Sequence, residues 1–168
     1  MVLICSGLCF GSFSQTPGPK PCSSPEASQF DVWVGDWILS WADTSHGANH
    51  VEKLFGTCVV HENFQSPATN FLGQSWSVYN PNYKQWQQTW VDSQGGYIAL
   101  SGGMAGDSLI LTTNEKVVPL TLSTSGKMQN RMVYYNIKPN SFDWSWDAST
   151  NGGKSWKQNW LIHYKRKQ

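Results

Sequence analysis

FDVWVGDW, residues Phe30 to Trp37, stands where a stretch rich in serine and proline gives way to patterned sequence. Its eight positions hold three aromatic residues, two aspartates and a glycine. Aromatic area this dense belongs either to a core or to the wall of a pocket. From this point onward, apolar and aromatic residues recur at every second position, which is typical of β-strands.

Short segments with this period of two follow one another to the end of the chain, and no comparable helical pattern competes with them. Turn sequences separate the segments: NPNY at 80–83, QGG at 94–96, AGD at 105–107, STSG at 123–126, PNS at 139–141 and NGG at 151–153. Closing such a sheet on itself removes its edges and brings the aromatic faces together. The sequence therefore predicts an all-β fold, an up-and-down antiparallel β-barrel of about nine or ten strands. A two-sheet sandwich is the alternative, but it needs Greek-key crossings that the short connections disfavour.

Length and charge limit the classes of function. A chain of 168 residues suits one domain, and its formal net charge is +1 with only 14% charged residues. Without a dense basic surface, nucleic acid and anionic membrane surfaces are not expected partners. Ten tryptophans make aromatic area the unusual feature of the composition.

The first residues resemble an export signal. The sequence MVLICSGLCFGSFSQ has an apolar run followed by a small-x-small pattern, although no Lys or Arg precedes Lys20 and the run is too short to span a bilayer. We expect a signal peptide over 1–14, a Pro/Ser-rich leader over 15–29 and the barrel domain over 30–168, in a secreted or periplasmic protein.

Cys5 and Cys9 would leave with the signal peptide, so Cys22 and Cys58 remain as a pair. In an oxidising compartment the two could form a disulfide between the leader and the barrel. The alternative is two free thiols. No cysteine or histidine spacing suggests a zinc site.

The triplet Gly35-Asp36-Trp37 resembles the Gly-x-Trp signature on the first strand of lipocalins. In lipocalins this tryptophan closes one end of the barrel against a basic residue of the last strand. The resemblance implies Arg166 as that partner, because its phase on the last strand is suitable.

The resemblance extends further along the chain. FDVWVGDW, CVVHENF, WSVYNP, QWQQTWVD and WSWDASTNGGKSW resemble, in this order, an uncharacterised bacterial family of single-domain, often exported, lipocalin-like (calycin) proteins. The resemblance covers the chain from about Cys22 to Arg166. Between Met104 and Met128 this sequence departs from the family pattern. Membership of this family would imply a β-barrel with an internal cavity, and it implies no particular activity.

The alternation predicts which side chains face the barrel interior. The polar ones are Glu62, Gln88, Asp92, Arg131 and Gln158, and the aromatic ones are Trp86, Trp90, Trp144, Trp146, Trp160 and Tyr135. A mostly apolar wall with a few polar groups is typical of a small-molecule site. Arg131 could hold a carboxylate, phosphate or enolate through its planar fork. Alternatively, Arg131 pairs with Glu62 or Asp92 and the tryptophans fill the barrel.

The predicted function is binding of a small, largely apolar or aromatic molecule with a polar or anionic group, held by Arg131, Gln88 and Gln158. The alternative is an isomerase, cyclase or hydrolase on the same scaffold, with Glu62 or Asp92 as acid/base because desolvation raises a carboxyl pKa. The sequence predicts no cofactor and leaves the oligomeric state open.

The histidines suggest little chemistry. His46 and His50, with Asp43 nearby, lie in a segment predicted to be a hairpin tip, and a third metal ligand is not evident. Some calycin-like barrels hold haem through a histidine of the wall, which would make His163 the candidate. The phase of its strand, however, places His163 on the outside.

Overall fold

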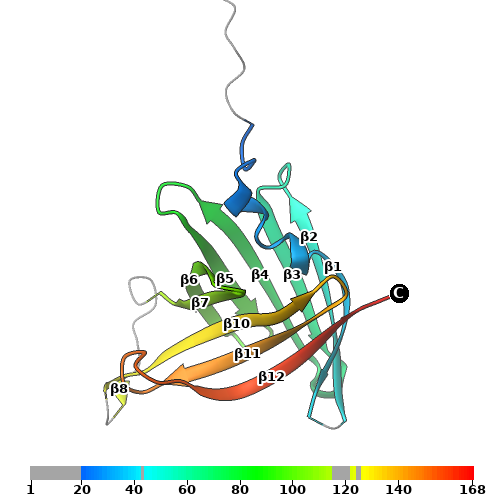
Figure 1. Cartoon of the computed structure of the whole chain (residues 1–168). Helices are drawn as coiled ribbons and strands as arrows, with labels where there is room; N and C mark the ends of the chain where they lie inside the picture. Colours follow the sequence, from blue (N-terminus) through cyan, green and yellow to red (C-terminus); the bar gives the residue numbers. More distant parts are fainter. Residues whose placement is uncertain (1–19, 43, 115–121, 124–125) are drawn as a thin grey trace, which may run out of the picture.

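The structure, a computed structural model, describes residues 20–42, 44–114, 122–123 and 126–168 (Figure 1). Within these residues, ten strands form a closed barrel. They are β1 (Gly35–Trp41), β2 (Ser45–Leu54), β3 (Val59–Ser66), β4 (Phe71–Asn80), β5 (Gln85–Asp92), β6 (Tyr97–Ala105), β7 (Ser108–Thr113), β10 (Gln129–Lys138), β11 (Ser141–Ser149) and β12 (Lys157–Arg166). The short strands β8 (Leu122–Ser123) and β9 (Gly126–Lys127) form a separate two-stranded sheet between β7 and β10.

The barrel is an antiparallel meander. Each strand pairs with its neighbour in the chain, β7 pairs with β10, and β1 pairs with β12 to close the ring. This arrangement confirms the predicted up-and-down barrel and excludes the sandwich, because no strand of the barrel among the described residues crosses to a second sheet. The predicted number of strands, nine or ten, is also right.

The FDVWVGDW segment closes one end of the barrel. It contains the 3-10 helix η2 (Asp31–Trp33), which follows η1 (Pro25–Ser28) and crosses the barrel end before β1 begins (Figure 1). Phe30 is fully buried against Trp86 and Tyr134, with ring centroids 4.5 and 5.6 Å away, and Trp33 lies 5.3 Å from Tyr134. The aromatic density of the opening stretch is therefore core, contributed by the segment that enters the fold.

Trp37 and Arg166 fix the first strand to the last. The Arg166 guanidinium lies 4.2 Å from the Trp37 ring centroid, and its Nη1 donates a hydrogen bond to the Val34 carbonyl at 2.9 Å. The Trp37 indole N–H donates to the carbonyl of Trp33 at 2.7 Å. The contact that the lipocalin resemblance implied is thus present.

Cys22 and Cys58 form a disulfide, as predicted. It joins the leader to the turn between β2 and β3, so it holds the closing segment against the barrel. A third 3-10 helix, η3 (Pro67–Thr69), connects β3 to β4. The predicted signal peptide over 1–14 lies outside the described residues, as does the part of the leader before Lys20.

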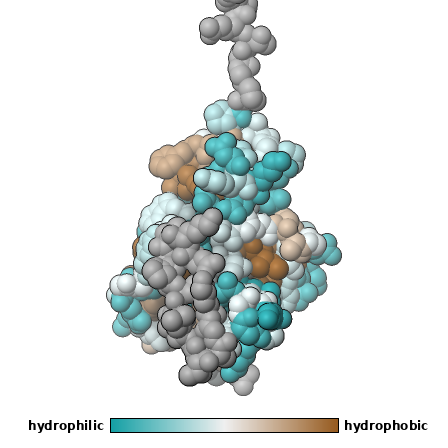
Figure 2. All heavy atoms as spheres, turned by 90° about the vertical axis from the view of Figure 1, so that its left-hand side faces the viewer, coloured by the Kyte–Doolittle hydropathy of each residue, from teal (hydrophilic) through white to brown (hydrophobic). Residues whose placement is uncertain are grey.

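Inward and outward side chains differ in character. Along β4 the burial alternates strictly, and Gly73, Ser75 and Ser77 are the buried members. On the face shown in Figure 2, hydrophobic residues appear as separate patches among hydrophilic ones. On β4 the inward side chains are thus small and Trp76 lies outside, whereas Phe30, Trp33, Trp37, Trp86, Tyr134, Phe142 and Tyr164 are buried in the core. Among the described residues, no helix has the length and apolar character needed to cross a membrane.

Candidate functional site

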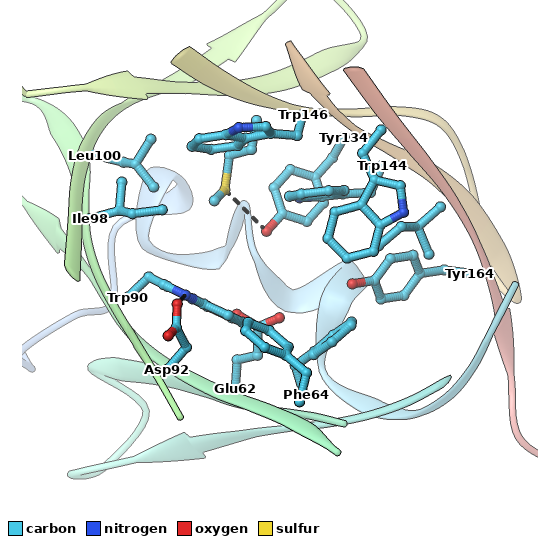
Figure 3. A pocket seen from close by; sticks show the side chains of 14 residues that line it. Glu62, Phe64, Trp90, Asp92, Ile98, Leu100, Tyr134, Trp144, Trp146 and Tyr164 are labelled. Carbon is cyan, nitrogen blue, oxygen red and sulfur yellow. Dashed lines mark hydrogen bonds between the residues drawn. The ribbon is translucent and has the colours of Figure 1, made fainter. Parts of the chain in front are cut away.

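The barrel encloses a cavity of about 220 Å³ (Figure 3). Its wall consists of Glu62, Phe64, Phe71, Trp90, Asp92, Ile98, Leu100, Met132, Tyr134, Trp144, Trp146, Trp160, Ile162 and Tyr164. Strands from both halves of the chain contribute, so the cavity exists only when the barrel is closed. The barrel is thus hollow in this part rather than filled by its tryptophans.

The N-terminal segment covers the end of the barrel behind this cavity, where its faint blue ribbon appears in Figure 3. Along β5, Trp86 lies against the closing segment, and Gln88, Trp90 and Asp92 follow at every second position away from it. Tyr134 contacts Phe30 on one side and lines the cavity on the other. The cavity therefore has an aromatic floor at the closed end.

Glu62 is the buried carboxyl of the site. Its Oε1 accepts a hydrogen bond from Asn49 Nδ2 at 2.7 Å, and its Oε2 accepts one from Ser75 Oγ at 2.6 Å. Burial raises the pKa of Glu62 from 4.5 to about 7, although the hydrogen bonds from Ser75 and Asn49 act in the opposite direction. The Glu62 carboxyl therefore changes its protonation state near neutral pH.

Two tyrosine hydroxyls point into the same cavity, Tyr134 and Tyr164 (Figure 3). Tyr164 accepts a hydrogen bond from Asn49 Nδ2 at 3.2 Å, and Tyr134 contacts the Met132 sulfur at 3.5 Å. Burial and the nearby Glu62 raise the pKa of both phenols well above the usual value. Both hydroxyls consequently keep their protons and can donate hydrogen bonds.

A polar network supports Glu62 from the side of β4 and β5. Gln88 Nε2 donates to Ser75 Oγ at 3.1 Å and to Ser77 Oγ at 2.9 Å. Within the described part of the chain, the buried oxygens Asn49 Oδ1 and Gln88 Oε1 have no protein partner. Asn49 bonds Glu62 directly, and Gln88 is connected to it through Ser75. The network around Glu62 therefore has acceptor oxygens that no protein donor satisfies.

Asp92 also lines the cavity, but its protonation state differs from that of Glu62. Its carboxylate accepts hydrogen bonds from Trp90 Nε1 at 3.0 Å and from the N–H groups of Gln94 and Gly96, both at 2.9 Å. Desolvation raises the pKa of Asp92, but the hydrogen bonds from Gly96, Trp90 and Gln94 together bring it below 3.8. The prediction of a raised pKa was therefore wrong for Asp92. It is an ionised group that orients Trp90.

The structure brings most of the predicted residues together. Glu62, Asp92, Trp90, Trp144, Trp146 and Trp160 all line the cavity. Trp86 and Gln88 lie inside the barrel but not on the cavity wall, because Trp86 packs on the closing segment and Gln88 supports Ser75. The indole N–H of Trp86 donates to Gln29 of the leader at 3.1 Å.

Arg131 and Tyr135 were placed on the wrong face. Met132 and Tyr134 line the cavity, so the residues that alternate with them point outward. Arg131 Nε donates to Asp147 Oδ2 at 2.9 Å, and its guanidinium lies 4.4 Å from the Trp156 ring centroid. The alternative, in which Arg131 pairs with Glu62 or Asp92, is thus wrong too. The sequence RMVYYN carries apolar side chains in both phases, so alternation alone could not choose between them.

Gln158 is exposed and does not line the cavity, contrary to prediction. On β12, Trp160 pairs with Trp146, but the next pair in the ladder is Gln158 with Asp147. A β-bulge therefore leaves Asn159 unpaired and reverses the phase of the strand before it. The pattern from Trp160 onward is right, and Ile162 and Tyr164 point inward as it requires.

Sequence reasoning missed several lining residues. Phe64, Ile162 and Tyr164 belong to period-two runs and could have been included from phase alone. To include Tyr134, the inward-facing residues of β10 would have had to be the other alternating set, the one that contains Met132. Asn49 and Ser75, which bond Glu62, gave no signal because small polar residues are typical of surfaces as well.

The histidines lie on the outside. His46 and His50 are exposed on β2 rather than at a hairpin tip, and His50 Nδ1 lies 2.8 Å from Asp36. Asp43 lies outside the described residues. His163 is exposed and hydrogen-bonded to Asp143 at 2.6 Å, so a haem held inside the barrel by His163 is ruled out. Within the described ranges, no three His, Cys, Asp or Glu side chains are grouped to hold a metal ion.

No protein-family model matches the sequence, and no match was found among curated proteins.

Proposed function

We propose that the barrel binds a small, largely apolar molecule inside the cavity and holds a polar group of that molecule near Glu62. The observation that supports this most is a cavity whose wall is aromatic and aliphatic except for two carboxyls and two phenols. An apolar cavity of about 150 Å³ is enough to bind benzene. At about 220 Å³, this one suits a ligand of one or two rings.

The sequence predicted a polar or an anionic group on the ligand, and the cavity wall supports only the first of these. An anionic group required Arg131 inside, and Arg131 pairs with Asp147 instead. The polar end of the cavity offers the Glu62 carboxyl and the hydroxyls of Tyr134 and Tyr164. The ligand group placed there is therefore a hydrogen-bonding group that does not add a negative charge.

Export is part of the proposal. The Cys22–Cys58 disulfide supports an oxidising compartment, such as the periplasm or the exterior of the cell. Membership of the lipocalin-like group is likewise proposed, and the Trp37–Arg166 contact supports it.

Ligand titrations of a cavity-filling variant test the binding function. Ile98 lines the cavity on β6, and its neighbour Tyr97 is exposed on the outer face. We expect one-ring and two-ring aromatic probes to bind with measurable heat, and Ile98→Trp to lose this binding while Tyr97→Trp keeps it. Arg131→Ala also keeps it. Equal binding by Ile98→Trp and the unchanged protein would place the ligand elsewhere.

A second candidate function is proton transfer, favoured by the pKa of Glu62 at about 7. In this reaction Glu62 takes a proton from the carbon beside a carbonyl group, the C–H electron pair forms an enolate, and a hydroxyl of Tyr134 or Tyr164 donates to the enolate oxygen. Return of the proton to a different carbon would complete an isomerisation.

Deuterium exchange tests this second candidate. We expect acetophenone in D₂O to exchange its methyl protons faster with the protein than without it, and Glu62→Gln to abolish the acceleration. Glu52→Gln, on the outer face of β2, serves as the matched control. If the wild-type protein gives only the buffer rate, Glu62 is not a base toward such substrates.

A further inference from the structure

We infer that the ligand class is an organic ammonium compound, a protonated amine on a small apolar body, with Glu62 as its counter-ion. This inference rests on the proposed binding function and specifies its ligand. The cavity wall contains two acids, Glu62 and Asp92. Among the described residues, no lysine, arginine or histidine lines it. The charge of the wall is thus negative or zero, and never positive.

The cations closest to the barrel interior are already engaged. Arg131 bonds Asp147, whose side chain is only 8% exposed. The Arg166 guanidinium lies over Trp37, and Lys53 pairs with Asp31 of the closing segment. Since each is held by its own partner, none is available to neutralise Glu62. A buried carboxylate that is hydrogen-bonded but has no opposite charge beside it is costly, so a ligand cation would be stabilised there.

The polar end of the cavity has more acceptors than donors. Glu62 accepts one hydrogen bond at each oxygen, and a carboxylate oxygen can accept two. Behind the wall, the buried oxygens Asn49 Oδ1 and Gln88 Oε1 of the same network have no protein donor within the described residues, so no side chain there supplies Glu62 with a positive charge. At this end the Tyr164 hydroxyl is a donor, whereas the Tyr134 hydroxyl already donates to the Met132 sulfur. The other donors of the wall are indole N–H groups, and that of Trp90 is bonded to Asp92. An ammonium group, which has donors and no acceptor, complements this set.

The remaining wall is suited to a cation as well. Trp144 and Trp146 stack at 6.3 Å with an interplanar angle of 12°, and Trp160 meets Trp144 edge to face at 5.7 Å. Indole faces attract cations through their quadrupole, more strongly when water is absent. Figure 3 shows Trp144 and Trp146 on the side of the cavity opposite Glu62 and Asp92. An amine between them contacts a carboxylate on one side and aromatic rings on the other.

This pairing has a pH dependence. Four titratable groups face the ligand space, namely Glu62, Asp92, Tyr134 and Tyr164. Asp92 is already ionised well below neutral pH, and the tyrosines keep their protons well above it. An alkyl amine stays protonated up to a pH of about 10. Glu62 alone changes charge near pH 7, so amine affinity should rise between pH 6 and 8.

Three ligands of the same skeleton test the inference by calorimetry: phenethylamine, phenethyl alcohol and phenylacetate. We expect the amine to bind about tenfold more tightly than the alcohol at pH 8, with the acid weakest. Glu62→Gln should reduce the preference for the amine to less than about threefold, whereas Glu52→Gln should leave it unchanged. The rise in affinity from pH 6 to 8 in the unchanged protein provides the same test without a variant.

The failures can be told apart. If the alcohol or the acid binds as tightly as the amine, the ammonium assignment is overturned and the binding function stands. If none of the three binds, and their naphthyl analogues do not bind either, the binding function itself is overturned.

Discussion

The Cζ atom of Arg166 lies 4.2 Å from the centroid of the Trp37 indole, which joins the last strand of the barrel to the first. The same guanidinium donates to the carbonyls of Val34 and Pro139, at 2.9 and 3.2 Å. A Cβ atom at Gly35, where φ is +132°, would run into Arg166 Nη1. Glycine at this position therefore leaves room for the arginine.

Removing this contact should weaken the closure of the barrel. We expect Arg166→Ala to lower the free energy of unfolding by about 2 kcal/mol, because it loses the cation–π contact and partly buried hydrogen bonds. The free energy of unfolding of Arg166→Lys should lie between those of the wild-type protein and Arg166→Ala, since lysine keeps the charge but not the planar guanidinium. Urea unfolding followed by circular dichroism gives all three values. An unchanged midpoint for Arg166→Ala would show that the contact contributes nothing.

Glu62 should make stability depend on pH. The folded protein holds the proton of Glu62 up to about pH 7, whereas the unfolded chain releases it near 4.5. Between these values the folded state binds more protons, so stability falls as pH rises. The contribution is about 3 kcal/mol across the window. Urea unfolding at pH 5 and pH 8 measures this fall in the free energy of unfolding. Glu62→Gln should abolish the fall, and Glu52→Gln should keep it. An equal fall in the wild-type protein and both variants would refute the assignment to Glu62.

The disulfide should be a major contribution to stability. It links Cys22 to Cys58 across 36 residues, and a loop of that length contributes about 4 kcal/mol by restricting the unfolded chain. We expect reductant to lower the urea midpoint of the wild-type protein. The double variant Cys22→Ser/Cys58→Ser should have that lower midpoint with or without reductant. Insensitivity of the wild-type protein to reductant would contradict the expectation.

Gly73 should control the position of Trp90 in the cavity wall. A Cβ atom at Gly73 would overlap the Trp90 ring, and that ring donates to Asp92. We expect Gly73→Ala to displace the indole, break its hydrogen bond to Asp92 and lower the free energy of unfolding by about 1 to 3 kcal/mol. Gly103→Ala, whose Cβ meets no atom within 4 Å, is the control. Identical tryptophan emission spectra of Gly73→Ala and the unchanged protein would argue against this role.

Much of the fold could be predicted from the sequence because the barrel depends on a simple alternation. Aromatic residues at every second position specify one face of a strand, and the turn residues between the runs specify a meander. The Trp37–Arg166 contact and the Cys22–Cys58 disulfide could also be predicted. The cavity tryptophans Trp90, Trp144, Trp146 and Trp160 follow from the same alternation.

The polar half of the site could not be predicted in full, for two physical reasons. On β10 apolar residues occur in both phases, and even the outward-facing Val133 is buried, so Arg131 and Tyr135 were placed inside and Tyr134 was missed. On β12 a bulge between Gln158 and Trp160 reverses the alternation of inward and outward side chains, and no residue type in this stretch indicates a bulge. Because Arg131 was placed inside, the sequence suggested that the polar group of the ligand could be anionic.

Native mass spectrometry of the protein purified from its own source tests the central claim, binding inside the barrel, most directly. The account predicts a bound small molecule on the unchanged protein and on Tyr97→Trp, and none on Ile98→Trp. A bare unchanged protein, or the same bound mass on Ile98→Trp, would contradict it.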